Sequence, residues 1–357
     1  MREFLYNLAT DKSRGFLAGA LKVFLFILSL IYGKIIRVLV WFYSLKPHRL
    51  NCKVISVGNI TLGGTGKTVL VEYIARFLKS RGIRAAILTR GYKRKLTAYS
   101  LQPTAVDNMG DEPYMLQSKL TDLPVIVDAD RVHGAKKAIR DYAVDTVILD
   151  DGFQQWKIKK DLDIVAIDST DPFGNQKILP RGVLREPLSS LKRAGIFILT
   201  KTNLNPNVED VEEFLQEINP QALIVESAHH PVSLRRLDNH AEILGLDILK
   251  GKTVALFCGI GDPDSFEGIV AGLGANIGLS FKFSDHHDYS EKDLQNIIQE
   301  ARKKSIDTFV TTEKDAARIN KSQITNHKSQ ILVLCIKLKI TRNEEGLHAR
   351  LLKLYNF

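Results

Sequence analysis

The sequence predicts an α/β protein of two domains, the first built on a parallel sheet and the second smaller, preceded by an apolar N-terminal helix. Two observations predict this fold class. After residue 50, short β-branched runs alternate with helical stretches, and near the N-terminus a long segment is almost free of charge. The chain has 357 residues, of which 45% are hydrophobic and 25% charged. This composition is typical of a globular protein, and the length is enough for two domains.

The N-terminal helix is expected to associate with a membrane. Residues 15–45 hold only three charged side chains, those of Lys22, Lys34 and Arg37. Their longest uncharged stretch, 23–33, would make a helix about 17 Å long, well short of the ~30 Å hydrocarbon core of a bilayer. The pattern favours an amphipathic or partly inserted helix over residues 1–45, although a tilted span and a helix buried in the protein's own core also fit. A signal peptide is disfavoured because the small residues 18–20 precede the apolar run.

The charge distribution agrees with a membrane surface. The chain carries a net charge of +10, and the first 50 residues hold eight basic and two acidic side chains, a local charge of +6. A nucleic-acid reader usually spreads its positive charge over the folded domain, so we expect no nucleic-acid partner and an anionic lipid surface instead. The three cysteines lie far apart without C-x-x-C spacing, which excludes a disulfide framework and a cysteine-type zinc site: Cys52, Cys258 and Cys335.

Strands covered on both faces are predicted from nearly continuous apolar runs. In the first domain these are residues 52–58, 85–89, 123–127, 145–150, 162–168 and 195–200, with helices such as 68–80 and 131–142 between them. Residues near 221–236 resemble two short strands. A second set follows at 253–258, 277–283, 307–312 and 331–336. The predicted organisation is therefore a first domain over 46–225, a two-stranded linker over 226–236 and a smaller domain over 237–357.

A phosphate-binding loop follows the first predicted strand. The segment GNITLGGTGKT (58–68) matches the P-loop pattern G-x-x-x-x-G-K-[ST] except at its first glycine position, where Thr61 stands. Glycines let backbone N–H groups converge on phosphate oxygens, and the helix that follows adds its positive N-terminal dipole. The sequence therefore predicts a P-loop NTPase domain that binds a nucleoside triphosphate. The expected nucleotide-binding residues are Thr61, Gly63, Gly64, Thr65, Gly66, Lys67 and Thr68.

A magnesium site is expected beside this loop. Thr68 occupies the P-loop position whose hydroxyl holds Mg²⁺. The strand at 145–150 ends in Asp150 after three apolar residues, and Asp151 follows it directly, the form of a Walker B strand. Because neighbouring residues of a strand point opposite ways, either carboxylate can be the direct ligand.

Other P-loop classes are disfavoured by single residues. Membrane-partitioning ATPases carry a second lysine where this chain has Leu62. GTPases read guanine with the aspartate of an [NT]-K-x-D turn, and the nearest match, 200–203, ends in Asn203. An asparagine amide offers one acceptor oxygen, whereas guanine presents two neighbouring donors. These residues favour a small-molecule kinase, which also needs an acceptor site and a base.

The loop and eight further segments together resemble the tetraacyldisaccharide 4′-kinase family, the lipid A kinases of Gram-negative bacteria. The ordered set is specific and spans most of the chain: GNITLGGTGKT (58–68), LTRGYKRK (88–95), GDEPYML (110–116), DADRVHGA (128–135), ILDDGFQ (148–154), LPRGVLREP (179–187), FCGIGDPDSF (257–266), FSDHHDY (283–289) and TTEKDAAR (311–318). The resemblance implies an ATP- and Mg²⁺-dependent transfer of phosphate to the 4′-hydroxyl of a tetraacylated glucosamine disaccharide 1-phosphate at the cytoplasmic face of the bacterial inner membrane. It implies no obligatory protein partner.

The resemblance also implies site residues. In the family, the aspartate of GDEP pairs with the first histidine of the DHH-type motif to activate the sugar hydroxyl, which here gives Asp111, in the first predicted domain, and His286, in the second. Lys67 is the third expected catalytic residue. Substrate-binding candidates within matching segments are Asn59, Arg90 and Arg185. The alternative reading is a membrane-tethered nucleotide-dependent switch that acts on a protein partner without acceptor chemistry.

Overall fold

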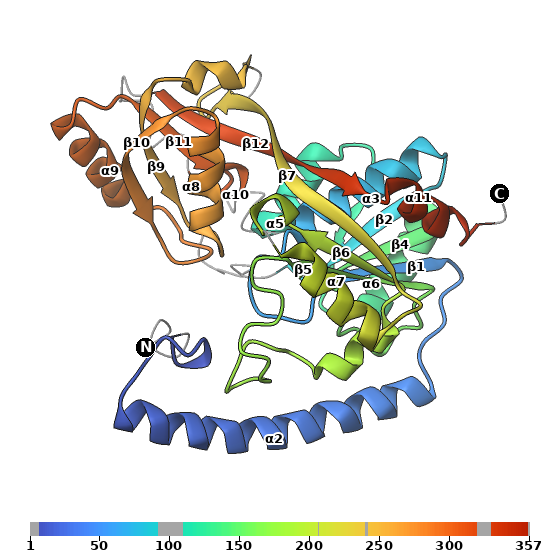
Figure 1. The fold of residues 1–357 in the computed structure, drawn as a ribbon. Coiled ribbons are helices and arrows are strands. Elements are labelled where there is room, and N and C mark those ends of the chain that lie inside the picture. Colours follow the sequence, from blue (N-terminus) through green and yellow to red (C-terminus); the bar gives the residue numbers. More distant parts are fainter. Residues whose placement is uncertain (1–6, 92–109, 206, 240–241, 320–329, 356–357) are drawn as a thin grey trace, which may run out of the picture. The chain divides into compact units, whose positions relative to one another are not determined.

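The computed structural model describes residues 7–91, 110–205, 207–239, 242–319 and 330–355, which form two compact units (Figure 1). The first unit draws on residues 1–90, 122–228 and 339–357, and the second on residues 91–121 and 229–338. Each unit is therefore assembled from separate stretches of chain, whereas the sequence analysis expects contiguous domains.

The first unit contains a parallel sheet with the strand order β7-β6-β5-β1-β4-β2-β3. Every strand pair with a described register in this part of the sheet is parallel. The strands are β1 (Lys53–Gly58), β2 (Ala85–Thr89), β3 (Val125–Val127), β4 (Thr146–Asp150), β5 (Leu162–Asp168), β6 (Ile196–Thr200) and β7 (Leu223–Arg236). The helices are α2 (Phe16–Leu45), α3 (Lys67–Ser80), α6 (Arg131–Tyr142), α7 (Val208–Ile218) and α11 (Glu344–Leu352), with 3₁₀ turns η1 (Leu188–Arg193) and η2 (Thr202–Leu204).

The continuous apolar runs become strands buried on both faces, as the sequence predicts. All residues of β2, β4 and β6 are buried. One core cluster joins Ala135 and Ala138 of α6 to apolar side chains of β1, β2 and β4. α3, with its own buried apolar stripe, packs on the same three strands. The P-loop NTPase fold expected for this part of the chain is thus present.

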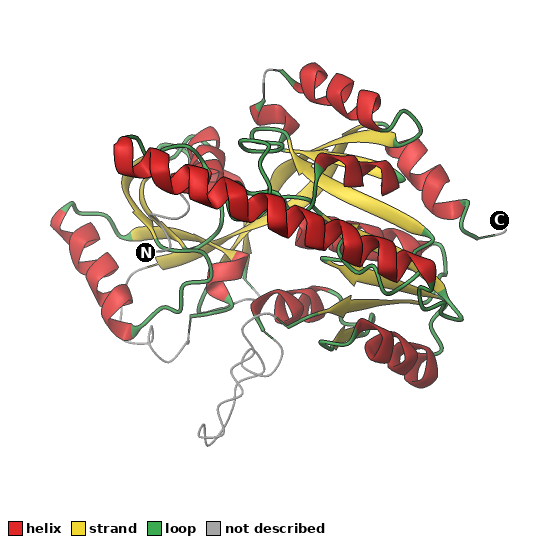
Figure 2. Cartoon of the chain, turned by 90° about the horizontal axis from the view of Figure 1, so that it is seen from below, coloured by secondary structure: helices red, strands yellow, loops and turns green. Residues whose placement is uncertain are grey.

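The apolar helix α2 lies along the first unit with one face only, and Figure 2 shows it as a single unbroken helix. Its buried residues, Leu25, Ser29, Gly33 and Ile36, fall at helical spacing on one stripe. Ser29 Oγ lies 2.8 Å from the carbonyl oxygen of Ile178, and a Cβ at Gly33 would lie 3.3 Å from the Ile178 side chain. The small side chain of Ser29 and the bare backbone of Gly33 thus let the helix approach the segment around residue 178 closely.

The second unit contains a sheet with the order β10-β9-β11-β12-β7-β8. Its own strands are β8 (Ile243–Leu244), β9 (Thr253–Cys258), β10 (Asn276–Lys282) and β11 (Thr308–Thr312), while β7 and β12 (Gln330–Arg342) contribute residues to both units. Its helices are α5 (Asp111–Lys119), α8 (Pro263–Gly272), α9 (Glu291–Lys303) and α10 (Glu313–Ala316), with the 3₁₀ turn η3 (Leu246–Leu249).

Two further expectations differ from this structure. Residues 223–236 form one strand, β7, and not two short ones; the interior proline, Pro231, removes one backbone donor without ending the strand. The helix α5 belongs to the second unit, whereas the sequence analysis expects Asp111 in the first. Ion pairs from both ends of α5 to α10 hold it there: Glu112 with Lys314, and Lys119 with Glu313 at 2.7 Å.

The segment that carries α11 completes the first unit. The His348 ring stacks on the ring of Phe77 in α3, with centroids 4.0 Å apart. The Asn343 amide donates to the carbonyl of Ile224 at 2.9 Å, and the hydroxyl of Tyr355 bonds that of Thr146. These contacts connect residues 343–355 to α3, β4 and β7.

Candidate functional site

The loop after β1 has the geometry of a phosphate cradle. Gly63 and Gly66 adopt φ angles of 120° and 77°, which glycine reaches without steric cost. α3 begins at Lys67 with Gly66 as its N-cap, and no side chain caps this end. The first backbone N–H groups of α3 are therefore available to donate hydrogen bonds to an anion, and the helix dipole favours negative charge at the same place.

The threonine at the first glycine position of the loop has a structural explanation. Thr61 forms an isolated antiparallel β-bridge with Leu184. On either side of it, Leu62 N donates to Val183 O and Arg185 N donates to Ile60 O, both at 2.8 Å. Because this half of the loop is extended and paired, its residues need no positive φ, and a β-branched side chain fits.

The carboxylates expected to hold Mg²⁺ lie at the end of β4, beside the loop. Asp150 is 4% exposed, and Asp151 follows it with a φ of 54°. Asp151 accepts from Arg185 Nη1 at 2.8 and 2.9 Å, and Lys67 Nζ lies 3.5 Å from its Oδ1. Partial burial alone would raise the pKa of Asp151, but the cations Lys67 and Arg185 outweigh it and hold that pKa below its usual value.

These residues fit a nucleotide-bound magnesium ion. Thr68, whose side chain is in the first turn of α3, is 7% exposed and thus held in place. Within the described ranges, no three histidine, cysteine, aspartate or glutamate side chains cluster as a metal cage. Mg²⁺ is usually held by one or two carboxylates plus substrate phosphates and water, so Thr68, Asp150 and Asp151 are a sufficient set of ligands.

Arg131 is a residue that the sequence analysis overlooks, although DADRVHGA contains it. Its guanidinium is 4% exposed, donates to the carbonyl of Asp128, and has Nη2 3.5 Å from the carbonyl of Asp150. Burial lowers the pKa of Arg131, opposed by the carboxylates of Asp150 and Asp151. A buried cation therefore faces the expected metal ligands from the start of α6.

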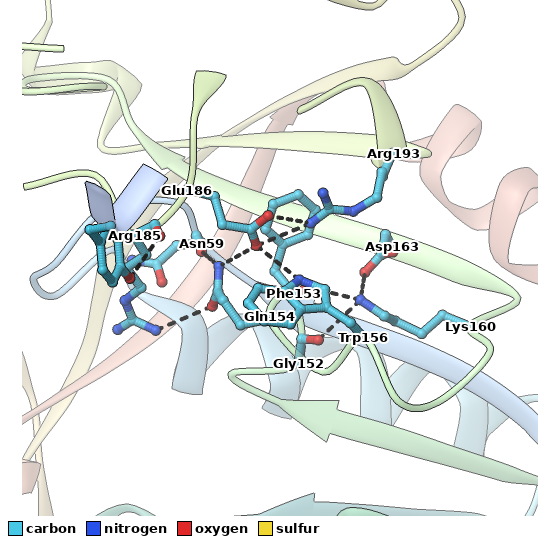
Figure 3. Close-up of polar contacts among 11 residues, drawn as sticks. Asn59, Gly152, Phe153, Gln154, Trp156, Lys160, Asp163, Arg185, Glu186 and Arg193 are labelled. Carbon is cyan, nitrogen blue, oxygen red and sulfur yellow. Dashed lines mark hydrogen bonds and ion pairs between the residues drawn. The ribbon is translucent and has the colours of Figure 1, made fainter. Parts of the chain in front are cut away.

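A second overlooked group supports the turn after Asp151 (Figure 3). Glu186 is fully buried and accepts from Arg193 Nη2 at 2.9 and 3.1 Å, from Gln154 Nε2 at 3.2 Å and from Trp156 Nε1 at 3.3 Å. Arg193 also lies over the ring of Phe153, 4.5 Å from its centroid. The signals in the sequence are that Glu186 lies in the segment LPRGVLREP and is adjacent to Arg185; its partners are separated from it along the chain.

The expected substrate-binding residues have different surroundings. Asn59 is fully buried, and its amide donates to the carbonyl of Thr61 at 2.8 Å, so it holds the loop. Arg185 is engaged with Asp151, and its carbonyl accepts from the hydroxyl of Tyr32 in α2 at 3.1 Å. Arg90, directly after β2, is exposed.

His286 lies in the second unit, in the loop after β10. It has a φ of 60°, its backbone N–H donates to Gly259 O at 3.0 Å, and its Nδ1 lies 3.1 Å from Arg318 Nη2. His287, by contrast, stacks on Phe283 with ring centroids 4.4 Å apart and bonds Asp293. The second histidine of the motif therefore belongs to the packing of the loop. Ser290 and Asp293 form a capping box at the start of α9, which ends this loop.

Asp111 is the first residue of α5, and its side chain lies outside the described residues. The next residue, Glu112, forms an ion pair with Lys314 of α10. Burial lowers the pKa of that lysine, but the carboxylates of Glu112 and Asp285 outweigh burial, and the pKa is raised. The start of α5 is thus linked electrostatically through Lys314 to the residue that precedes His286, and Asp111 and His286 belong to the same unit.

Comparison with known proteins gives consistent matches over almost the whole chain. The model of the tetraacyldisaccharide-1-P 4′-kinase family matches residues 21–356. A tetraacyldisaccharide 4′-kinase from Halothermothrix orenii is 37% identical, over 89% of this chain and 90% of the relative. One from Elusimicrobium minutum is 35% identical, over 84% and 82%. The crystal structure of the "apo" form of LpxK from Aquifex aeolicus in complex with ATP has a TM-score of 0.71 and 30% identity, over 94% of this chain and 99% of that one.

The buried lysine that holds the turn after Asp151 gives a stability prediction. Lys160 donates to the carbonyls of Gly152 and Phe153 at 3.1 and 3.0 Å and to Asp163 at 2.9 Å. Burial lowers the pKa of Lys160, and Asp163 opposes the effect. Lys160→Met leaves a nearly buried carboxylate unpaired, so we expect it to reduce the free energy of unfolding by about 3 kcal/mol in urea denaturation.

The double variant Lys160→Met/Asp163→Leu removes both charges and is the matched control. It should recover a large part of that loss, because the penalty comes from the unpaired charge. Equal losses in the single and double variants would show that Lys160 acts through the two carbonyls alone.

Proposed function

Because this chain belongs to the tetraacyldisaccharide 4′-kinase family, we propose roles for its residues in the family's reaction. In that reaction the γ-phosphate of ATP is transferred to the 4′-hydroxyl of a tetraacylated glucosamine disaccharide 1-phosphate. The reaction gives lipid IVA in lipid A biosynthesis, with ATP and Mg²⁺ as cofactors. A switch without acceptor chemistry is not favoured, because the family match covers residues 21–356.

The cation pair on Asp151 supports the assignment of the phosphate site. Lys67 stands at the first position of α3, beside the uncapped helix end, where it reaches the β- and γ-phosphates. Thr68 with Asp150 and Asp151 would hold Mg²⁺, which when bound neutralises charge on the phosphates. Arg185, which the sequence analysis expects at the substrate, orients Asp151 in this assignment.

The acceptor hydroxyl needs a proton acceptor. We assign this task to the carboxylate of Asp111, assisted by His286, and we assign exposed Arg90 to the anionic acceptor. The link from Glu112 through Lys314 to Asp285 supports this pairing, because it connects the residues next to Asp111 and His286. Asn59 contributes indirectly, by holding the phosphate loop.

Lys67→Ala tests the phosphate site. The variant loses a charge that follows the transferred phosphoryl group, so we expect kcat to fall by about 10²–10³-fold. The measurement is transfer of labelled phosphate from ATP to the lipid A disaccharide precursor. Lys79→Ala removes an exposed lysine from the same helix and should leave kcat unchanged. Near-normal transfer by Lys67→Ala contradicts the proposal, and so does a rate of ATP turnover that is the same with and without the lipid precursor.

Asp111 and His286 are tested together. Each single alanine variant should lose about 10²–10⁴-fold in kcat, and the double variant much less than the product, because residues that act as a unit are non-additive. Glu112→Gln, which removes the neighbouring ion pair, is the control for damage to the start of α5 and should keep most of kcat. Strictly multiplicative losses would separate the two residues, and full activity of Asp111→Ala would exclude it as the base.

We further propose that α2 lies in the plane of the inner membrane at its cytoplasmic face, where ATP is available. An 18-residue window of α2 has a mean hydropathy of 2.2, as in spanning helices, yet its buried stripe packs on the first unit. The opposite face exposes large apolar side chains: Phe16, Leu17, Val23, Phe24, Phe26, Ile27, Leu28, Leu30, Ile31, Ile35, Val38, Trp41, Phe42 and Leu45. A helix held by protein along one face and apolar along the other fits an interfacial position.

Vesicle binding tests this placement. Ile27 and Ile31 are each 53% exposed, so Ile27→Asp/Ile31→Asp should not disturb folding but should strongly reduce co-sedimentation with anionic vesicles. Val232→Asp/Ile243→Asp introduces the same charges at exposed apolar positions outside α2 and should bind as the unaltered chain does. If both double variants bind equally well, α2 is not the membrane-facing element.

A further inference from the structure

Arg318 is a buried guanidinium to which the reaction as assigned above gives no task. Its side chain is 1% exposed, just after α10. Nη1 donates to Gly259 O at 3.0 Å and lies 3.4 Å from Asp315 Oδ1, while Nη2 lies 3.1 Å from His286 Nδ1. A cation placed this deeply against a histidine ring constrains where that ring can carry protons.

The direction of the bond between Arg318 and His286 follows from the chemistry of the two groups. A guanidinium has donors and no acceptor, and it stays protonated in proteins. Nδ1 of His286 must therefore supply its lone pair, which leaves the ring proton on Nε2. A second proton, on Nδ1, would break this bond and place a positive ring against the guanidinium.

The backbone fixes both partners of this bond. The carbonyl of Gly259 accepts from the backbone N–H of His286 and from Nη1 of Arg318, each at 3.0 Å. Asp315, which is fully buried, accepts from Gly259 N at 2.9 Å and from the hydroxyl of Tyr289 at 3.1 Å. The guanidinium thus meets the ring in one orientation.

We propose that Arg318 is a positioning residue that keeps His286 neutral, with its proton on Nε2, so that His286 serves phosphoryl transfer as a hydrogen-bond donor and not as the base. This rests on the proposed role of His286. It leaves proton removal from the sugar hydroxyl to a carboxylate, as assigned to Asp111, and gives the histidine the task of orienting that carboxylate or the hydroxyl through Nε2–H.

Three further contacts of charged groups in the described loop and α10 bear on the position of this proton. On its own loop, Asp285 Oδ2 lies 3.8 Å from Nε2 and favours a proton there. From α10 and the turn after it come Lys314, which is paired with Glu112, and Arg318, which is paired with Asp315. The acid on the Nε2 side and the cation on the Nδ1 side favour the same tautomer.

The first measurement is the ¹⁵N spectrum of the full chain labelled at histidine, with His286→Gln used to assign the resonance. We expect Nδ1 of His286 to give the shift of an unprotonated ring nitrogen, and Nε2 that of a protonated one, at neutral pH. A proton found on Nδ1 overturns the proposal directly. This result does not depend on activity, so it stands even if His286→Gln retains full kcat, which would instead refute the proposed role of His286.

The second measurement is the pH profile of kcat in Arg318→Met, Arg318→Lys and the control Tyr289→Phe. Loss of the guanidinium removes the bond that occupies the Nδ1 lone pair, so the acid limb of the profile in Arg318→Met should move upward by about one pH unit or more. Activity should recover toward high pH. Arg318→Lys retains the charge and should shift less, and Tyr289→Phe, which removes another bond to Asp315, should not shift.

A purely structural role for Arg318 predicts a different result. It would lower kcat of Arg318→Met by the same factor at every pH and leave the His286 tautomer unchanged, and either observation overturns the proposal. If Arg318→Met does not fold, Arg318→Lys and the spectrum of the unaltered chain still decide it.

Discussion

The carboxylate of Asp151 joins the parts of the first unit that the phosphate site depends on. It is held by Lys67 at the start of α3 and by Arg185, which comes from the segment paired with the phosphate loop. Lys160 holds the turn that carries Asp151, by donating to the carbonyls of Gly152 and Phe153. A small displacement of this one carboxylate would therefore disturb contacts of the phosphate loop, of the turn after β4 and of the segment around residue 185.

The same segment explains the polar residues within α2. Ser29 and Tyr32 are unexpected in an apolar helix, but Ser29 accepts from Arg181 N at 3.0 Å and Tyr32 donates to Arg185 O. Asp11 adds ion pairs to Lys22 and Arg181, both at 2.7 Å. These contacts hold the helix against the segment around residues 178–185, and the side chain of Arg185 in that segment reaches Asp151. The element proposed to face lipid is therefore joined to the phosphate site by short hydrogen bonds.

Features encoded by neighbouring residues were predictable from the sequence. The bounds of β2 and β5 agree with the apolar runs, because strands buried on both faces carry that pattern locally. The phosphate loop is also recognised from short spacings. Features decided by distant pairs were not. α5 joins the second unit through two ion pairs, whose partners are separated by 194 and 202 positions in the sequence, and no local sequence pattern predicts these pairs.

The site shows the same division. Lys67, Thr68 and the aspartates after β4 are read from motifs, whereas the orientation of Arg185 toward Asp151 and the burial of Glu186 depend on the folded backbone. Asn59 is a substrate-binding candidate by its motif position, but a motif position does not reveal the direction of a side chain, and this one is fully buried.

The composition of the first unit has a consequence for its biosynthesis. Its segments lie on both sides of the second unit in the chain, and α11 with the residues around it is translated after all the others. Phe77, Thr146 and Ile224 can therefore contact His348, Tyr355 and Asn343 only after residues 229–338 of the second unit have been made. Until then, the nucleotide-binding unit on the ribosome lacks part of its surface, and its final stability is acquired only when translation reaches this last segment.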